Sequence, residues 1–358
     1  MKCDMRVSTG LLVALAALGS ADCAKRGPRD VSNENPISQF PADLSNDATI
    51  GRTEPQGERV IAKPAAMGQK PRVIASASAR ALVTDAERVY FGDDDDDVLY
   101  TLPKADVVRD TPVRIARRAP MPGGLSFDAH DRTLAWIGAP GDIVLRIPVG
   151  GGTPTTVRDR GIFIDVVATG GDVFFTEARG TGGTLTRVTG NTAAHLADFE
   201  GLPRGIAVDG ANVYLATSSR LVVSPRTRGE ISELAKGAGF GHPVVDDTWL
   251  YATEVAPNSR ARLLVRMKKS GGRLETIATG VRDAPIALHR GTVYWFDDER
   301  PALLSASMLE APTSGFTPSV LADDPMLGRV GALAVDEDGA FVATGYGESG
   351  RIAVIPIP

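Results

Sequence analysis

Cysteine is almost missing from this sequence, and its scarcity excludes a fold held together by disulfides. Cys3 and Cys23 are the only two cysteines among 358 residues, and both lie close to the N-terminus. The chain beyond Cys23 therefore cannot form an internal disulfide. Its stability must come from a hydrophobic core, and a composition that is 43% apolar supplies enough material for a sizeable one.

Clustered positive charge and recognisable catalytic motifs are absent as well. The formal net charge is −5 and the basic residues form no long cluster, which argues against a nucleic-acid partner. The sequence contains no H-E-x-x-H zinc motif and no G-x-S-x-G nucleophile elbow, and its 4 histidines show no metal-ligand spacing. We therefore assign no catalytic residue, no resident metal and no cofactor from the sequence.

The first 23 residues have the pattern of an export signal. Lys2 and Arg6 precede the apolar run LLVALAAL at residues 11–18, and small residues follow it. This run is shorter than the roughly 20 apolar residues that a membrane-spanning helix needs. We therefore predict a signal peptide over residues 1–23, and export of the remainder to the periplasm, the outer membrane or the cell exterior.

The residues around Cys23 leave two ways of processing this signal. SADC at residues 20–23 resembles the lipoprotein box of bacteria, which implies that Cys23 becomes the lipidated first residue of an outer-membrane lipoprotein. Ser20 stands where leucine is usual, and Asp22 stands where glycine or alanine is usual. The alternative is simple cleavage near Ala21, with Cys23 incidental. Contact with a membrane is expected only through such a lipid.

Residues 24–70 have the composition of a linker. They are rich in Pro, Asn, Asp, Ser and Gln, carry charges of both signs and show no sustained apolar period. A segment of this kind cannot bury enough apolar surface to offset the entropy lost on folding. We predict a disordered tether between the signal and the folded domain.

From residue 71 onward the sequence repeats a short β-type segment seven times. The mean spacing is roughly 42 residues, a period typical of propeller blades. Alternating strands and glycine turns follow each segment, so that each repeat contains four short antiparallel strands. The segments are ERVYFGD, RTLAWIG, GDVFFTE, ANVYLAT, TWLYATE, GTVYWFD and GAFVATG, which begin near Val89, Leu134, Val173, Val213, Leu250, Val293 and Ala340.

The seventh repeat ends at Pro358 after only three strands. The stretch PRVIASAS, residues 71–78, precedes the first repeat and matches the strand type that is missing. We predict that this N-terminal strand pairs on the outside of the last blade, because the pairing would satisfy an open strand edge and close the ring. The predicted fold is all-β, a seven-bladed β-propeller over residues 71–358 with four-stranded antiparallel blades.

The repeats also resemble a known group of proteins. IAVDGANVY, VYWFDD, GGTPTTV and GGRLETIATG are similar to the repeats of secreted bacterial β-propellers of the NHL, YWTD and virginiamycin-B-lyase-like kind. The YWTD type has six blades, so the count of seven fits the seven-bladed relatives better. The resemblance implies blades and not chemistry, since no catalytic motif of those families can be matched here residue by residue.

Five consecutive carboxylates, Asp93 to Asp97, fall between the second and third strands of the first repeat. The same slot in the other repeats holds unrelated residues, so we predict an exposed acidic hairpin tip. Calcium binding is the alternative interpretation, because oxygen ligands suit that ion. The run does not match an EF-hand, since Val98 stands where the invariant glycine should be.

Aspartates also recur just before the second strand of several repeats, as Asp209, Asp246 and Asp336. Asp side chains at such positions accept hydrogen bonds from backbone N–H groups two and three residues ahead. Their recurrence indicates turn capping and not catalysis.

One face of the predicted propeller gathers the charged residues that we take as binding-face candidates. Arg80, Arg204, His242 and Arg329 enter the first strands of their blades from the side on which the acidic tip lies. Asp297 and Asp298 belong to the same face, with Glu177, Glu254, Glu299 and Glu348. We therefore expect an acidic rim around a partly basic channel mouth, and His242 is the strongest single candidate there.

Two functions remain open on the sequence alone. The first is a non-catalytic binding or scaffold propeller of the bacterial cell envelope, a monomer that takes a protein, a small molecule or a polysaccharide on one face. The second is a metal-assisted lyase or hydrolase that acts at the channel mouth. The lack of nucleophile and metal motifs favours the first.

Overall fold

The structure of the protein, a computed structural model, describes residues 68–104, 111–118, 120–227, 229–257, 259–309 and 316–358. The expected signal peptide, Cys23 and residues 24–67 of the expected linker lie outside this part of the chain. The described residues are mostly strand, with two short 3-10 helices, η2 (Pro325–Gly328) and η3 (Gly347–Ser349). None of their helices is long and apolar enough to cross a membrane.

The first three blades are sheets of four consecutive strands. Blade one contains β2 (Ala79–Thr84), β3 (Arg88–Asp93), β4 (Val98–Pro103) and β5 (Val113–Arg117). Blade two contains β6 (Pro120–Asp128), β7 (Thr133–Gly138), β8 (Ile143–Pro148) and β9 (Thr155–Asp159). Blade three contains β10 (Phe163–Thr169), β11 (Asp172–Arg179), β12 (Gly182–Thr189) and β13 (Thr192–Glu200).

The next three blades repeat this order of strands. Blade four contains β14 (Pro203–Val208), β15 (Asn212–Thr217), β16 (Arg220–Pro225) and β17 (Ser232–Lys236). Blade five contains β18 (Phe240–Val245), β19 (Trp249–Val255), β20 (Arg262–Lys268) and β21 (Glu275–Thr279). Blade six contains β22 (Ala287–His289), β23 (Thr292–Phe296), β24 (Ala302–Ser307) and β25 (Ser319–Asp323).

Blade seven joins the two ends of the folded chain. It combines β26 (Val330–Asp336), β27 (Gly339–Thr344) and β28 (Arg351–Ile355) with β1 (Arg72–Ala75), which lies outermost. The pairing is antiparallel, with Val73 opposite Ala353 and Ala75 opposite Ile352. The predicted closure by an N-terminal strand is therefore confirmed, although the strand is shorter than the stretch 71–78, because the chain leaves blade seven to begin the inner strand of blade one.

All seven segments that repeat in the sequence form the second strand of a blade. They are β3, β7, β11, β15, β19, β23 and β27. These strands are rich in β-branched and aromatic residues and are buried on both faces, as the central strands of stacked sheets should be. The all-β fold with seven four-stranded antiparallel blades is thus confirmed.

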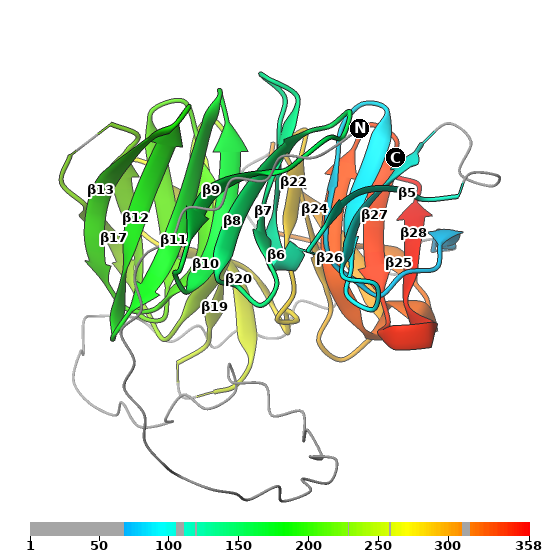
Figure 1. Cartoon of the computed structure of the whole chain (residues 1–358). Helices are drawn as coiled ribbons and strands as arrows, with labels where there is room; N and C mark the ends of the chain where they lie inside the picture. Colours follow the sequence, from blue (N-terminus) through cyan, green and yellow to red (C-terminus); the bar gives the residue numbers. More distant parts are fainter. Residues whose placement is uncertain (1–67, 105–110, 119, 228, 258, 310–315) are drawn as a thin grey trace, which may run out of the picture. The chain divides into compact units, whose positions relative to one another are not determined.

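The blades form a ring in which the first strands of neighbouring blades meet at the centre. Contacts lead from β2 to β6, then to β10, β14, β18, β22 and β26, and β26 contacts β2 again. Figure 1 shows the result, with the first blade in cyan beside the last blade in orange and red. Closure of this kind leaves only short edges, at the outer strands and toward the centre of the ring.

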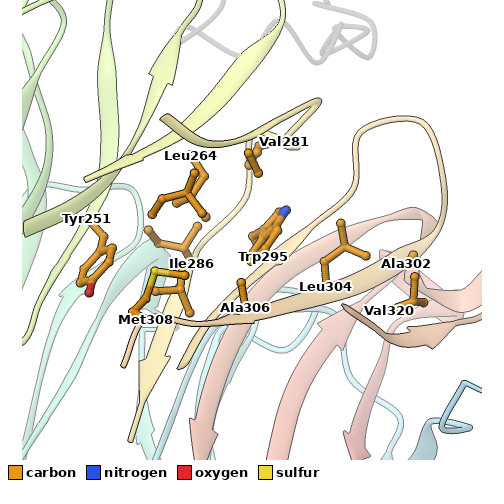
Figure 2. Packing of buried hydrophobic residues seen from close by; sticks show 13 residues of the cluster. Tyr251, Leu264, Val281, Ile286, Trp295, Ala302, Leu304, Ala306, Met308 and Val320 are labelled. Atoms are coloured by element: carbon orange, nitrogen blue, oxygen red, sulfur yellow. The ribbon is translucent and has the colours of Figure 1, made fainter. Parts of the chain in front are cut away.

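The hydrophobic core lies between blades and consists of clusters that join two neighbours each. In the cluster of Figure 2, Tyr251 and Leu264 of blade five pack with Trp295 and Leu304 of blade six. Tyr251 and Trp295 are completely buried. Such buried aromatic residues add large apolar areas to the contacts that hold neighbouring sheets face to face.

Aspartates at the inner turn of several blades act as caps, as predicted. Asp246 accepts backbone hydrogen bonds from Thr248 and Trp249 with one oxygen, at 2.7 and 2.6 Å, and the Tyr251 hydroxyl with the other, at 2.8 Å. Asp209 makes the same three contacts to its own turn and to Tyr214. A side chain with both oxygens engaged in this way supports a tight turn.

Candidate binding site at the channel mouth

The centre of the ring encloses a cavity of about 680 Å³. All seven blades contribute to its wall, which is largely apolar. One apolar residue from each blade illustrates this: Leu82, Leu125, Val166, Ile206, Val244, Ile286 and Leu333. The cavity is large enough to enclose a small ligand or the end of a chain.

Charged residues in the cavity wall are few and belong to the beginnings of the inner strands or, for Asp283, to the loop before one. They are Arg80, Asp165, Arg204, His242 and Asp283. The first residues of the inner strands lie at the same end of the cavity, because in neighbouring blades these first residues contact each other. A Cβ on Gly205 would lie 3.3 Å from the His242 nitrogen, and one on Gly331 would lie 2.7 Å from the Ala79 carbonyl oxygen. The polar end of the cavity is its mouth.

At this mouth, basic side chains of blades four and five surround a single carboxylate, Asp283, which lies just before the first strand of blade six. Arg262, from the third strand of blade five, donates from Nη2 to Asp283 Oδ2 at 2.5 Å. His242 Nε2 lies 3.5 Å from the other oxygen of Asp283. Burial acts to raise the pKa of Asp283, but the contact with His242 and the charges of Arg262 and Arg204 outweigh it and hold the pKa below its usual value.

Arg204 adds a second guanidinium beside this group and has no counterion of its own in the described part of the chain. Its side chain lines the cavity and is exposed to it. Burial by the channel walls lowers the pKa of Arg204, the neighbouring charge of Arg262 lowers it further, and Asp283 opposes both. Two arginines thus share one carboxylate, which leaves an excess of positive charge at the mouth.

The backbone around His242 is shaped to bring its ring to this place. His242 has a φ of +48°, a left-handed conformation that is uncommon for a residue with a side chain. A register shift between Gly241 and Val244 marks a β-bulge there, and bulges re-aim side chains. Gly205 leaves room for the turn, since a Cβ on it would lie 2.4 Å from Pro243 Cδ.

Arg80 occupies the mouth from blade one but is already neutralised. Its Nε lies 2.6 Å from Asp94 Oδ2, and its guanidinium carbon lies 5.1 Å from the centre of the Tyr346 ring. The salt bridge and the stacking fix the side chain against the loop that precedes η3. Arg80 therefore contributes shape to the mouth, and Arg204 contributes free charge.

Asp165 is a functional-site residue that the sequence analysis missed. It lines the cavity, with Oδ1 accepting the Val166 N–H at 2.8 Å and Oδ2 accepting the Ile206 N–H at 2.9 Å. Burial by the channel walls raises its pKa to about 7, and the two backbone donors only partly offset this. A carboxyl group with this pKa can hold or release a proton near neutral pH.

Of the six predicted binding-face residues, the structure brings three together in the cavity wall, namely Arg80, Arg204 and His242. Arg329, Asp297 and Asp298 are not in that wall. Arg329 and Asp298 are exposed at the surface, and their part in binding stays a prediction.

The expected acidic rim is only partly present. Glu254 and Asp297 are buried, with exposed fractions of 0% and 6%, and so are not on a solvated rim. Asp297 is buried because its Oδ1 caps a turn, accepting the N–H groups of Glu299 and Arg300 at 2.9 and 3.0 Å. This carboxylate organises its own hairpin from beneath the loop.

The run Asp93 to Asp97 forms the turn between β3 and β4, as predicted, but only its last three residues are exposed. Asp93 is buried and its Oδ1 accepts the Asp95 N–H at 3.0 Å, while Asp94 pairs with Arg80. Burial raises the pKa of Asp93 and of Asp94, and neighbouring carboxylates add to the shift. The turn is thus linked to the channel mouth through the pair of Asp94 with Arg80, a residue of the cavity wall.

Metal ligands do not gather within the described residues. No three side chains of His, Cys, Asp or Glu come together there in a way that could hold an ion. The residues at the mouth are mainly cationic, which suits an anion better than a metal. Calcium at the acidic turn stays an untested alternative.

Solved structures that superpose on this chain are β-propellers of low sequence identity. An oligogalacturonate lyase in complex with manganese has a TM-score of 0.62 and 12% identity, covering 82% of this chain and 94% of that one. The Swd1 β-propeller domain of Myceliophteria thermophila has a TM-score of 0.61 and 12% identity, covering 81% and 100%. YCF48 bound to D1 peptide has a TM-score of 0.57 and 12% identity, covering 82% and 97%.

These likenesses show the fold alone. No protein-family model matches the chain, and no curated protein matches it.

Proposed function

We propose that the protein is a binding propeller of the cell envelope, whose ligand enters the mouth of the central cavity. The observation that carries this proposal is Arg204, a cavity-lining arginine with no ion pair in the described part of the chain. An exposed arginine that lines a cavity and has no ion partner keeps its guanidinium free for an incoming anion.

The shape of the site supports binding by a preformed surface. The left-handed backbone of His242 and the stacking of Arg80 on Tyr346 hold these side chains in place. Few side chains therefore have to lose conformational freedom when a ligand binds. Similar propellers are known in complexes, among them YCF48 with D1 peptide and an oligogalacturonate lyase with manganese. A peptide or an acidic saccharide at one face of the ring is the use of this fold that we favour for the present chain.

The cellular location of the protein is also part of the proposal. The predicted signal at residues 1–23 would export the chain, and Cys23 would carry lipid and anchor it to the outer membrane. Mass spectrometry of the mature N-terminus tests this. A lipid-modified Cys23 supports the anchor, an unmodified chain that begins at Asp22 keeps export and rejects the anchor, and a chain that retains Met1 rejects both.

The binding proposal is tested with the full mature chain and a fractionated envelope extract. Wild-type protein and the variant Arg204→Ala/His242→Ala are immobilised side by side, and retained material is identified by mass spectrometry. We expect a ligand that the wild type retains and the double variant loses. Material retained equally by both would place binding elsewhere and would overturn the proposal.

A second candidate function is an enzyme, and Asp165 is the observation that favours it. A lyase or hydrolase needs a proton acceptor or donor, and a carboxyl group with a pKa of about 7 in an enclosed cavity can serve as either. The described residues do not bring metal ligands together beside it, so no metal-assisted step can be derived. Turnover of a retained ligand that Asp165→Asn abolishes, with binding preserved, would establish this alternative.

A further inference from the structure

We propose that the ligand is the C-terminal end of a peptide, with its terminal carboxylate on Arg204 and an aliphatic last side chain inside the cavity. This inference rests on the proposed binding function and deepens it. It follows from three features of the cavity, namely the charge at its mouth, the apolar wall beyond the mouth, and the backbone edges that surround it.

The charge at the mouth suits a single carboxylate. Arg262 is 12% exposed, and its Nη2 pairs with Asp283, while its Nη1 is buried without a hydrogen-bond partner. Arg204 has its whole fork available beside it. Arginine binds planar carboxylates with two parallel hydrogen bonds, and such charge-assisted bonds are stronger than neutral ones.

The wall beyond the mouth suits an aliphatic group. Beyond Arg204, the strand continues with Ile206, and blades six and seven add Ile286 and Leu333 to the same cavity. The only further carboxyl group in the wall is Asp165, and both of its oxygens are engaged by backbone N–H groups. A charged or strongly polar side chain would lose its hydration here without gaining a partner, whereas a leucine-sized group would gain by burial.

The edges of the inner strands suit a peptide backbone better than a plain hydrocarbon chain. Each inner strand is the last strand of its sheet and pairs on one side only, so its other edge faces the centre of the ring. Side chains of the protein already accept N–H groups of this edge, where Asp165 accepts from Ile206 and Ser126 accepts from Ala168 at 3.0 Å. A peptide can meet the remaining N–H and C=O groups with its own, and a fatty acid cannot.

The inference is tested with two matched peptide libraries and the full mature chain. Both libraries carry fluorescein at the N-terminus and randomised final positions; one ends in a free carboxylate and the other in an amide. We expect the carboxylate library to bind at least about tenfold more tightly, with Leu, Ile or Val enriched at the last position. Arg204→Ala should remove this difference. Arg158→Ala, an exposed arginine of the outer strand β9 that lies outside the cavity wall, should preserve it.

The outcomes separate this inference from the proposed function. Equal binding of the two libraries, no binding of either, or enrichment of charged final residues overturns the peptide terminus. If displacement by decanoate matches that by the best free peptide, the ligand is a simple aliphatic carboxylate and the peptide assignment is wrong. In each of these cases, Arg204-dependent retention of an envelope ligand would leave the binding function standing, and loss of that dependence would remove both.

Discussion

Asp165 Oδ2 accepts a hydrogen bond from the Ile206 N–H at 2.9 Å, so that a side chain of blade three holds the inner strand of blade four. The bond crosses the boundary between two repeats at the wall of the central cavity. It couples the protonation of one carboxyl group to the contact between two blades, and this coupling can be measured.

The first prediction concerns pH. The pKa of Asp165 rises from 3.8 to about 7 on folding, chiefly through burial. Between these values the folded state holds a proton that the unfolded chain has released, so the free energy of unfolding should fall as pH rises from about 4 to about 7. The slope from this one group is at most about 1.4 kcal/mol per pH unit. Asp165→Asn should remove that part of the slope.

The measurement is urea unfolding of both proteins at several pH values from about 5 to about 8. Asparagine loses one acceptor, which lowers stability by a constant amount and leaves the difference in slope readable. Asp159→Asn, a change at an exposed carboxylate, should keep the wild-type slope. Parallel curves for wild type and Asp165→Asn would show that the carboxyl group is ionised throughout.

The second prediction concerns closure of the ring. Ile74 in β1 is 6% exposed and belongs to the cluster that joins blades one and seven, whereas its neighbour Val73 is 50% exposed. Ile74→Asp should cost several kcal/mol, about 3–5, because it removes buried apolar area and buries an unpaired charge. Val73→Asp is the matched control in the same strand and should cost less than about 1 kcal/mol.

Thermal unfolding followed by circular dichroism compares the two variants. A cooperative loss of the whole domain at lower temperature is expected for Ile74→Asp, because blades one and seven depend on each other for burial. Equal melting temperatures would mean that β1 is peripheral and that the ring is closed by other contacts.

The strands could be predicted because each blade repeats one local pattern. Val89, Val173 and Val293 begin segments of the same β-branched and aromatic type, and each stands in the second strand of its blade. The missing strand of the last repeat could be inferred by counting, since a strand of the right type stood unpaired at residues 72–75. Periodicity carries this information because it is a property of neighbours along the chain.

The site could be predicted only in part, because it depends on irregular backbone and on contacts between blades. Asp165 lies in a strand with a register shift between Phe163 and Asp165, and the residue types there do not predict that bulge. Arg262 contacts Asp283 from the third strand of blade five, and no rule of sequence spacing predicts a contact between two such positions. His242 could be found because its glycine and proline neighbours indicate a turn at the start of a strand.

The third prediction concerns the cap that recurs at the inner turns. Tyr251→Phe removes the hydroxyl that Asp246 accepts at 2.8 Å, and it should cost about 1 kcal/mol. Asp246→Ala should cost more, because two backbone N–H groups lose their acceptor as well. The double variant should cost less than the sum of the two single changes, and additive costs would show that the hydroxyl and the carboxylate do not interact.

The last prediction concerns the five consecutive aspartates. Replacing Asp94, Asp95 and Asp96 together with serine should lower the free energy of unfolding by less than about 1 kcal/mol, because the only ion pair lost within the described contacts of these three, Arg80 with Asp94, is partly exposed. Asp93→Ala should cost more, about 1–2 kcal/mol, since Asp93 is buried and accepts a backbone hydrogen bond within the turn.

Melting of each variant with excess calcium and with a chelator decides between the two interpretations of this turn. If the turn is only a hairpin tip, calcium changes the melting temperature of wild type and of the triple variant equally. A calcium-dependent rise that the triple variant loses would show that the turn binds the ion. Calcium binding would then also affect the channel mouth, because Asp94 holds Arg80 in the cavity wall. Ligand binding should therefore become calcium-dependent.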